Sequence, residues 1–420
     1  MKFLEHFRTK EDRAFWWLRL NGIEKLDSLL KPRIVFNVAS LGELNGAIPV
    51  ARTLRELGFS GSIILSVGTP TAFRKARLLE SSEQDLIAVP APLEIPRSVS
   101  AFLKKIQPDL FVNFEAEYWP MLFAGLKASN VPVILVNGRI SKRSFLIYNL
   151  FSGTFSRIFR QFARLGMISE THRERAIRLG AHPGAVFVTG SSKYDDFSVR
   201  RDQKKDLSMW QQRLKTDSKF PIIVAGNLRG RECFIVVNTI KKLSGYFPNL
   251  LAVLAPRHLY RVKEIFKEAS DMGFNPCFLS SLTNGKIPLT KNLTVIVVDT
   301  FGDLFDLYGI ADIAFCGGTF EPIGGHNIVE PVVWGKKVLY GPFIHKVERE
   351  HEVLEKWGMG ILCQDPDDLL KQLKIEVEKV DRCRMGGVED IVHQAIEELS
   401  GASRIYASWI IELTERRRKN

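Results

Sequence analysis

The sequence predicts an α/β protein with two doubly wound domains, each built on a parallel sheet. A chain of 420 residues is too long for one ordinary hydrophobic core. Short apolar, β-branched runs alternate with helix-like patterns, which is typical of parallel strands buried on both faces. The alternation stops over the polar, highly charged residues 197–221 and then begins again. This pause indicates a linker between two domains.

The apolar runs define the expected strands in chain order. Helix-like patterns such as 47–57 and 98–106 separate most of them. The first series predicts strands at 33–40, 62–68, 85–91, 109–114, 131–138, 164–169 and 186–190. The second series predicts strands at 221–226, 250–258, 275–281, 294–299, 311–318, 336–341 and 358–364. Because ligands of open α/β sheets bind outside the carboxyl ends of the strands, a binding cleft is expected between the two domains.

These patterns divide the chain into an N-terminal amphipathic segment, a first domain, a linker with one short helix, a second domain, and a C-terminal helix with a basic tail. The boundaries are 1–30, 31–200, 201–220, 221–395 and 396–420. In the first segment aromatic and aliphatic residues alternate with arginines: Arg13, Phe15, Trp16, Leu18, Arg19 and Leu20. Such a helix either lies at a bilayer interface or docks its aromatic face on the protein's own core, and the sequence leaves both open.

The composition is that of a folded globular protein, with 45% hydrophobic and 25% charged residues. Five cysteines without a CxxC pair argue against a disulfide framework or a zinc site. A net charge of +12 favours nucleic acid, anionic lipid or phosphorylated substrates without choosing among them, and evenly spread solubility charge is the alternative. No run reaches the ~18 apolar residues of a membrane span, so we expect a soluble or peripheral protein.

The stretch GGTFEPIGGHNIVEP at 317–331 is the most informative motif. Glycines at a strand end let a ligand approach the backbone closely, and a helix start behind them offers N–H groups and a positive dipole end to a phosphate. Asn327 is the expected cap of that helix, and Glu330 is placed to accept hydrogen bonds from ribose hydroxyls. A structural turn rarely needs His, Asn and Glu together. A nucleotide site is therefore favoured over a capped glycine turn.

The longer stretch IADIAFCGGTFEPIGGHNIVEPVVWGKKVLYGP resembles the nucleotide-binding segment of the bacterial 3-deoxy-D-manno-octulosonic acid (Kdo) transferases of lipopolysaccharide synthesis. Six further stretches resemble the same family in the same order: ASLGELNGAIPVARTL, EAEYWP, NGRISKRS, VTGSSKYD, APRH and DTFGDLFDLYGIAD. The resemblance implies the GT-B fold, in which two doubly wound Rossmann-like domains face a central cleft. It implies an inverting glycosyltransferase that moves Kdo from CMP-Kdo to a hydroxyl of the lipid A precursor, lipid IVA, without a metal or other cofactor. The implied location is the cytoplasmic face of the inner membrane, where the protein binds peripherally and has no nucleic-acid partner.

In the first domain, the resemblance makes Glu43 the catalytic base. Inverting transfer needs one carboxylate to take the proton of the attacking hydroxyl, although an acid is also favoured at any helix N-terminus. The implied substrate-binding residues are Ser40, Gly42, Glu115, Glu117, Arg139 and Lys193. Glu115 and Glu117 face one side if the segment is extended, and Lys193 is expected to pair with the Kdo carboxylate or an acidic neighbour. Arg139 and the Phe/Arg-rich segment 145–165 either meet lipid phosphates and the membrane, or 145–165 is an ordinary core helix.

In the second domain, the resemblance implies a CMP site made of Arg257, His258, Asp299, Thr300, Gly302, Asp303, Gly324, Gly325, His326, Asn327 and Glu330. The chain departs from the family pattern at NLRGREC, where Arg229 stands in place of a His and Cys233 in place of an acid. It also lacks the usual hydrophobic anchor at its start, so interfacial attachment is expected. The alternatives are a nucleotide-sugar epimerase or hydrolase of the same fold, and a non-catalytic nucleic-acid-binding protein. The dispersed basic residues disfavour the latter.

Overall fold

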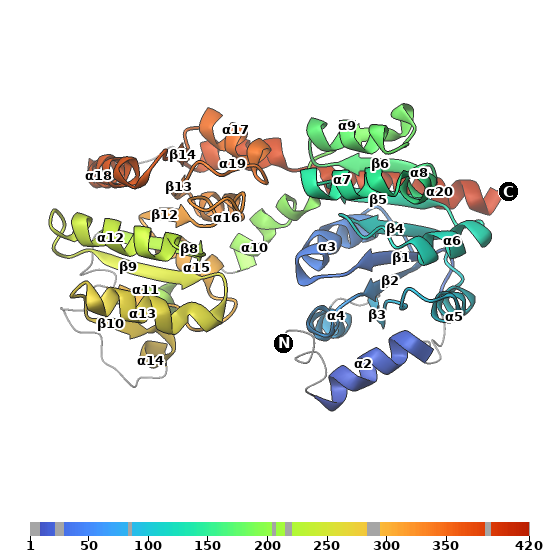
Figure 1. Cartoon of the computed structure of the whole chain (residues 1–420), viewed down its shortest axis with the longest axis horizontal. Helices are drawn as coiled ribbons and strands as arrows, with labels where there is room; N and C mark the ends of the chain where they lie inside the picture. The colour runs from blue at the N-terminus through green and yellow to red at the C-terminus, as the bar shows by residue number, and fades with distance from the viewer. Residues whose placement is uncertain are drawn as a thin grey trace. The chain divides into compact units, whose positions relative to one another are not determined.

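The computed structural model describes residues 9–21, 29–82, 86–203, 207–214, 221–283, 295–382 and 388–419. The chain forms two compact units: Met1–Asp196 together with Ser400–Asn420, and Phe197–Leu399. Each unit contains a seven-stranded sheet whose paired strands are parallel, with helices packed on it (Figure 1). The predicted α/β fold with two doubly wound sheets is confirmed.

The sheet of the first unit has the strand order β3-β2-β1-β4-β5-β6-β7. Its strands are β1 (Arg33–Val38), β2 (Ser62–Val67), β3 (Leu86–Pro90), β4 (Leu110–Phe114), β5 (Val133–Gly138), β6 (Phe162–Met167) and β7 (Val186–Val188). Each of them lies within or overlaps a predicted apolar run. The chain order reverses between β1 and β4, which makes the carboxyl ends of these two strands the topological switch point where open α/β sheets bind ligands.

Helices cover both faces of this sheet: α2 (Lys10–Asn21), α3 (Leu41–Glu56), α4 (Pro70–Ser82), α5 (Pro96–Ile106), α6 (Pro120–Ala128), α7 (Lys142–Leu150), α8 (Ser152–Phe159), α9 (Glu170–Arg178) and α20 (Ala402–Lys419). Successive side chains of a strand point to opposite faces. Ile34 and Phe36 of β1 accordingly pack in one core cluster with α3, α4 and α20, whereas Val35 packs in a second cluster with α5, α6 and α8.

The C-terminal helix α20 returns to the first unit and becomes part of its core. Tyr406, Ala407 and Ile410 are buried in the same cluster as β1 and α3. The carboxylate of Asp195 accepts the backbone N–H groups of Gly401 and Ser403, the latter at 2.6 Å. The chain leaves the first unit after Asp196 and returns to it at Ser400. These hydrogen bonds therefore join the two points at which the chain passes between the units.

The N-terminal helix α2 docks on the first unit through one face. Phe15 is buried with its ring centroid 5.3 Å from that of Phe73. The buried guanidinium of Arg19 donates to the carbonyls of Ala91 and Gly68, at 2.8 and 2.9 Å. Trp17 on the other face remains exposed. The docking alternative is confirmed for Phe15, and an interfacial role for the exposed face stays a prediction.

The sheet of the second unit has the order β10-β11-β9-β8-β12-β13-β14. Its strands are β8 (Ile222–Leu228), β9 (Leu251–Pro256), β10 (Pro276–Phe278), β11 (Val295–Val297), β12 (Ile313–Cys316), β13 (Lys337–Tyr340) and β14 (Gly360–Leu362). Its helices are α10 (Phe197–Gln203), α11 (Ser208–Leu214), α12 (Glu232–Ser244), α13 (Val262–Asp271), α14 (Leu279–Thr283), α15 (Leu304–Ile310), α16 (Val329–Val333), α17 (Glu348–Lys356), α18 (Pro366–Arg382) and α19 (Val388–Leu399). The chain order reverses between β8 and β12, so the switch point of this sheet lies at the carboxyl ends of these two strands.

The segment predicted as a linker with one helix differs from the expectation. Among its described residues two helices are present, α10 and α11, and both belong to the second unit. Trp210 and Leu214 of α11 are buried. These buried apolar residues hold the polar stretch against the second unit. The high charge of the stretch was therefore not sufficient evidence for a separate linker.

Candidate active site

Glu43 lies in the first turn of α3, directly after β1. The N-cap Ser40 accepts the backbone N–H of Glu43 through its hydroxyl at 3.3 Å. The Glu43 carboxylate reaches back to the N–H of Ala39 at 2.6 Å. This reciprocal pairing closely resembles a capping box. The capping role that the sequence left open for Glu43 is therefore present in the structure, alongside its place at the carboxyl edge of the sheet.

The surroundings of Glu43 favour its protonated form. Burial is the main reason that the pKa of Glu43 rises to about 8, and the negative charges of Glu115 and Glu117 raise it further. The N–H of Ala39 and the ammonium of Lys193 act in the opposite direction. An ordinary capping glutamate at a helix start is solvated and stays acidic. A carboxyl group with a pKa near 8 is suited to accept a proton at physiological pH.

Glu115 follows the end of β4 and carries the ion pairs of the site. Its backbone is left-handed, with φ of 56°, so the segment is not extended as the prediction required. The charges of Glu115 and Glu117 nevertheless both act on Glu43. The Glu115 carboxylate pairs with the ammonium of Lys193 and lies 3.7 Å from the guanidinium of Arg139. Burial alone would raise the pKa of Glu115, but these two cations hold it below its usual value. Lys193 thus has the acidic neighbour that the sequence predicted.

Glu117 lies two residues after Glu115. Its carboxylate accepts the indole N–H of Trp119 at 2.8 Å. Burial raises its pKa, as does the charge of Glu115, while Trp119 and Arg19 lower it. Arg19 lies 5.9 Å from the Trp119 ring centroid, so the N-terminal helix contributes a charge to this part of the site. That contribution could not be predicted from the sequence, because Arg19 is about a hundred residues away in the chain.

The remaining substrate-binding predictions of the first unit fall close by. Five of these residues lie at or just after the carboxyl ends of strands: Ser40, Glu115, Glu117, Arg139 and Lys193. Gly42 is exposed within the first turn of α3, and a Cβ there would meet nothing closer than 3.7 Å. The strand-to-helix turn is made by Ala39 and Ser40, and Gly42 is not needed for it.

The second unit gathers basic side chains where β8 and β9 end. Arg257 donates to the side-chain oxygen of Asn227 at 3.4 Å. A guanidinium nitrogen of Arg229 lies 3.3 Å from Nε2 of His258. Arg229, which replaces the histidine of the family pattern, therefore stands beside the predicted Arg257 and His258 and adds a permanent positive charge.

His326 completes this basic cluster from the loop after β12. Burial is the main reason that the pKa of His326 falls to about 3, and nearby positive charges add to the effect. Those charges belong to Arg257, Arg229, Lys346 and His258. Its buried Nε2 has no hydrogen-bond partner among the described residues. A neutral imidazole with an unpaired nitrogen, surrounded by cations, is an arrangement that an anionic ligand would satisfy. The sequence did not point to Lys346.

The glycines of the 317–331 loop make room for the protein's own side chains, contrary to the prediction that they leave room for a nucleotide. A Cβ on Gly318 (φ 75°) would lie 2.7 Å from the His326 ring. A Cβ on Gly324 (φ 99°) would lie 2.4 Å from the His345 ring. The loop's glycines thus bring two imidazoles close to the backbone.

The backbone amides at the start of this loop hold a carboxylate. Glu232, fully buried at the start of α12, accepts the N–H groups of Gly318 at 2.7 Å and of Thr319 and Phe320 at 3.0 Å. The amides at this strand end are therefore paired within the protein, whereas the phosphate was expected at the helix start behind the loop. Sequence analysis missed Glu232, and its place directly after a glycine-containing turn is the signal that could have indicated it.

The helix after the loop also differs from the prediction. The N-cap of α16 is Ile328, and Asn327 precedes it. The Asn327 side chain accepts the N–H of Val329 at 3.2 Å and donates to Glu330 at 3.2 Å. Asn327 is therefore wrong as the N-cap, although it does pair with the helix start. A helix of five residues has only a small dipole, so positive charge here comes mainly from side chains.

The remaining donor-site predictions lie after β11, beside the end of β9. Asp299 accepts the N–H of Ser280 at 2.9 Å and its hydroxyl. The hydroxyl of Thr300 donates to Asp303. Gly302 has φ of 102°, and a Cβ there would meet nothing within 4 Å. Asp299, Thr300 and Asp303 thus shape the turn that Gly302 permits.

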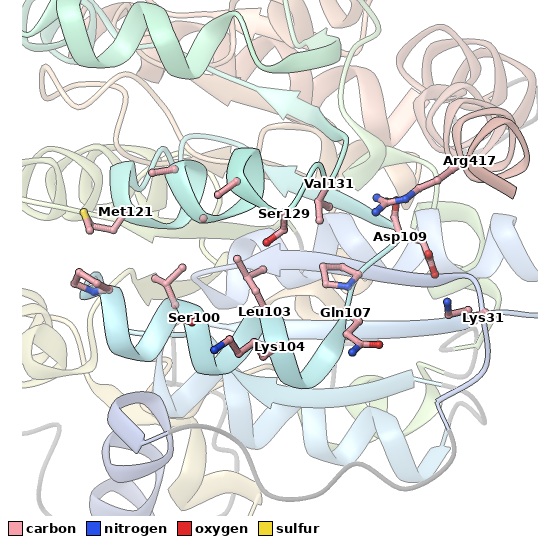
Figure 2. A pocket seen from close by; sticks show the side chains of 16 residues that line it. Lys31, Ser100, Leu103, Lys104, Gln107, Asp109, Met121, Ser129, Val131 and Arg417 are labelled. Atoms are coloured by element: carbon pink, nitrogen blue, oxygen red, sulfur yellow. The ribbon is translucent and has the colours of Figure 1, made fainter. Parts of the chain in front are cut away.

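A cavity of about 600 Å³ lies elsewhere on the first unit, between α5 and α6 (Figure 2). Its lining includes Leu103 and Lys104 of α5, Met121 of α6, Lys31 and Arg417. Asp109, just before β4, also lines it, and none of the predicted site residues does. The cavity and the Glu43 cluster are therefore separate.

No group of three His, Cys, Asp or Glu side chains that could hold a metal ion occurs in the described part of the chain. Four cysteines are described and all are buried and free: Cys233, Cys277, Cys316 and Cys363. Cys383 lies outside the described residues. Within the same described residues, no helix is long and apolar enough to cross a membrane.

The two sheets and their strand orders define a GT-B protein, and solved structures agree. A glycosyltransferase from Rickettsia africae superposes with a TM-score of 0.63 at 15% identity, over 93% of this chain and 100% of that one. A UDP-GlcNAc 2-epimerase from Neisseria meningitidis gives a TM-score of 0.63 at 15% identity, over 90% of this chain and 100% of that one. At such low identity these likenesses show the fold alone.

Sequence relatives narrow the class to one family. Residues 12–196 match the family described as 3-deoxy-D-manno-octulosonic-acid transferase (kdotransferase). The 3-deoxy-D-manno-octulosonic acid transferase of Aquifex aeolicus is 33% identical over 337 residues, which cover 80% of this chain and 84% of that protein. The Haemophilus influenzae transferase is 30% identical over 73% of this chain and 70% of that protein. The chain belongs to the Kdo transferase family and is a glycosyltransferase.

Proposed function

We propose that this chain transfers Kdo from CMP-Kdo to a hydroxyl of the lipid A precursor lipid IVA, with inversion at the anomeric carbon. The observation that carries the proposal is Glu43, a buried carboxyl group whose pKa is about 8, at the position that matches the family's base. Membership of the Kdo transferase family supports Kdo as the transferred sugar in lipopolysaccharide synthesis. The donor CMP-Kdo and the acceptor lipid IVA go beyond family membership and are proposed here.

In the proposed reaction, the ionised Glu43 takes the proton of the acceptor hydroxyl as its oxygen forms a bond to the anomeric carbon. The bond from that carbon to the CMP phosphate oxygen breaks, and the electron pair leaves with CMP. Glu43 ends protonated and releases its proton to solvent before the next turnover. A base with a pKa near the working pH is effective because a useful fraction is ionised while its proton affinity remains high.

The second unit would bind CMP-Kdo through its basic cluster. Arg257 and Arg229 present planar guanidinium groups suited to phosphate oxygens. The unpaired nitrogen of neutral His326 would accept or donate one further hydrogen bond to the donor. These fixed charges would stabilise the phosphate charge that develops on CMP, so we propose that no metal ion is needed.

The acceptor is a lipid, and one surface of the first unit favours a membrane. Helix α7 has no fully buried residue, although Phe145 and Tyr148 pack partly buried against the core. The core-helix alternative for 145–165 therefore holds for one face of α7, and its other face is exposed. Leu146, Ile147, Leu150 and Phe151 are exposed there, beside the basic Lys142 and Arg143. In α8, by contrast, Ile158 and Phe159 are buried. We propose that this exposed apolar and basic surface holds the protein peripherally at the cytoplasmic face of the inner membrane.

The test is mass spectrometry of a tetra-acylated lipid A precursor incubated with CMP-Kdo, EDTA and the purified chain. The expected product carries added Kdo and appears with free CMP. Glu43→Gln should abolish it, whereas Glu170→Gln, a change at a solvent-facing acid of α9, should leave it intact. Release of CMP without lipid modification would favour the hydrolase alternative, and product formation by Glu43→Gln at the wild-type rate would remove Glu43 from its role.

A further inference from the structure

The hydroxyl of Tyr406 ties two strand ends of the first unit together. Tyr406 lies in α20 and is fully buried. Its oxygen accepts the backbone N–H of Asn137, at the end of β5, at 3.0 Å. After β7, the same oxygen lies 2.5 Å from the hydroxyl of Thr189 and 3.3 Å from the carbonyl of Gly190. Gly166 of β6 leaves the space for the ring, since a Cβ there would lie 2.3 Å from it.

Asn137 extends this connection towards the helix that carries Glu43. Its backbone is left-handed, with φ of 52°. Its side-chain amide donates to the hydroxyl of Ser192 at 2.7 Å and accepts the N–H of Ser192 at 2.9 Å. Ser192 donates in turn to the carbonyl of Gly46 at 2.7 Å. Gly46 follows Glu43 within one turn of α3, so a buried hydrogen-bonded chain runs from Tyr406 to the base-bearing helix.

The two cations that flank Glu115 are attached to the same anchored residues. Lys193 directly follows Ser192 and pairs with Glu115. Arg139 is two residues after Asn137 and lies 3.7 Å from the same carboxylate. We propose that Tyr406 is a positioning residue of the active site: its hydroxyl fixes the ends of β5 and β7, and thereby the placement of Lys193 and Arg139 around Glu115.

This placement bears on Glu43, and its kinetic consequence rests on the proposed function. The charged groups that act on Glu43 are Glu115 and Glu117, after β4, and Lys193, after β7. Lys193 lowers the pKa of Glu43, whereas the two acids raise it. When the Lys193 segment is less firmly held, the ionised form of Glu43 loses part of its stabilisation. The acidic limb of the rate profile then moves to higher pH.

The test compares Tyr406→Phe with Thr414→Val. The first change removes the hydroxyl and keeps the ring. The second removes another buried hydroxyl of α20, whose hydrogen bonds within the described residues go to carbonyls of its own helix, Ile410 and Ile411. For Tyr406→Phe we expect kcat to fall about tenfold, equivalent to ~1.4 kcal/mol, with an unchanged KM for CMP-Kdo and a higher acidic limb. Thr414→Val should keep the wild-type kcat and pH profile, whatever its melting temperature.

Two results would overturn the inference: a wild-type kcat and pH profile in Tyr406→Phe, or the same kinetic change in Thr414→Val. If the wild-type chain transfers no Kdo, the proposed function fails, and the positioning role is then decided without turnover. The carboxyl carbon of Glu43 is titrated by NMR in ¹³C-glutamate-labelled protein, assigned with Glu43→Gln. A higher titration midpoint in Tyr406→Phe supports the role, and an unchanged midpoint refutes it.

Discussion

Replacing Glu43 with glutamine should stabilise the first unit, and the gain should depend on pH. Below pH 4.5 the carboxyl is protonated in the folded and unfolded chain alike. Between 4.5 and about 8 the unfolded chain loses the proton while the folded chain keeps it. Folding is therefore penalised as pH rises through this window, and the full penalty is present above pH 8. Glutamine has no proton to lose and removes this penalty.

The size of the effect follows from the pKa. The rise from 4.5 to about 8 corresponds to at most ~5 kcal/mol, at 1.36 kcal/mol per pKa unit. The glutamine oxygen can still accept the Ala39 N–H, but a neutral acceptor makes a weaker bond than a carboxylate. We therefore expect a net gain of ~1–3 kcal/mol at pH 8.5. For a unit of this size that is ~2–4 °C in melting temperature per kcal/mol.

The assay is thermal and urea unfolding of the wild type and Glu43→Gln at pH 5 and pH 8.5, followed by circular dichroism. Glu170→Gln serves as the control, because its carboxylate is more than half exposed and its ion pair with Arg173 lies at the surface, where such pairs contribute little. Equal melting temperatures of the wild type and Glu43→Gln at pH 8.5 would refute the buried, proton-retaining carboxyl. So would a gain of the same size at both pH values. Since no substrate is involved, the result bears on the geometry alone.

Four further outcomes are expected. Arg257→Lys should weaken CMP binding about 10–100-fold, because an ammonium cannot replace a planar two-bond contact, and isothermal titration calorimetry measures this. Gly318→Ala should destabilise the second unit by ~1–3 kcal/mol, since φ is 75° and the new Cβ meets His326; unfolding of the variant checks it. Arg19→Met should cost the first unit ~3–5 kcal/mol in the same measurement, because it leaves buried carbonyls without their donor. Leu150→Glu should reduce sedimentation with anionic liposomes at least severalfold while leaving the melting temperature within about 1 °C; undiminished sedimentation would remove α7 from the membrane surface.

The strands were predictable because parallel strands covered on both faces are continuously apolar. Runs such as IADIAFC and SIILSVG are typical of strands buried on both faces of a parallel sheet. The details that failed are those set by backbone geometry. The left-handed Glu115 and the shift of the α16 cap from Asn327 to Ile328 leave no trace in residue type, because glutamate rarely adopts positive φ and isoleucine is a poor cap.

The glycine loop shows why a motif identifies a site better than it describes one. The stretch GGTFEPIGGHN indicates that some group approaches the backbone closely, but it does not identify that group. In the structure the approaching groups are the Glu232 carboxylate and the rings of His326 and His345. Glu232 comes from α12, almost ninety residues earlier, and such a partner is fixed only when β8 and β12 pair side by side.

For Glu43, too, the local motif does not describe the environment that sets the pKa of its carboxyl group. Serine followed three residues later by glutamate is a common helix start, and in isolation it favours a solvated, acidic carboxylate. The feature that suits Glu43 to the proposed role of base is its raised pKa, which other parts of the chain cause mainly by burying the carboxyl group. The charges of Glu115 and Glu117, in the turn after β4, raise the pKa further, whereas Lys193, after β7, lowers it. The chain-order reversal between β1 and β4 places that turn next to the start of α3. A local sequence signal for the raised pKa of Glu43 therefore cannot exist, because its proton affinity depends on the sheet topology.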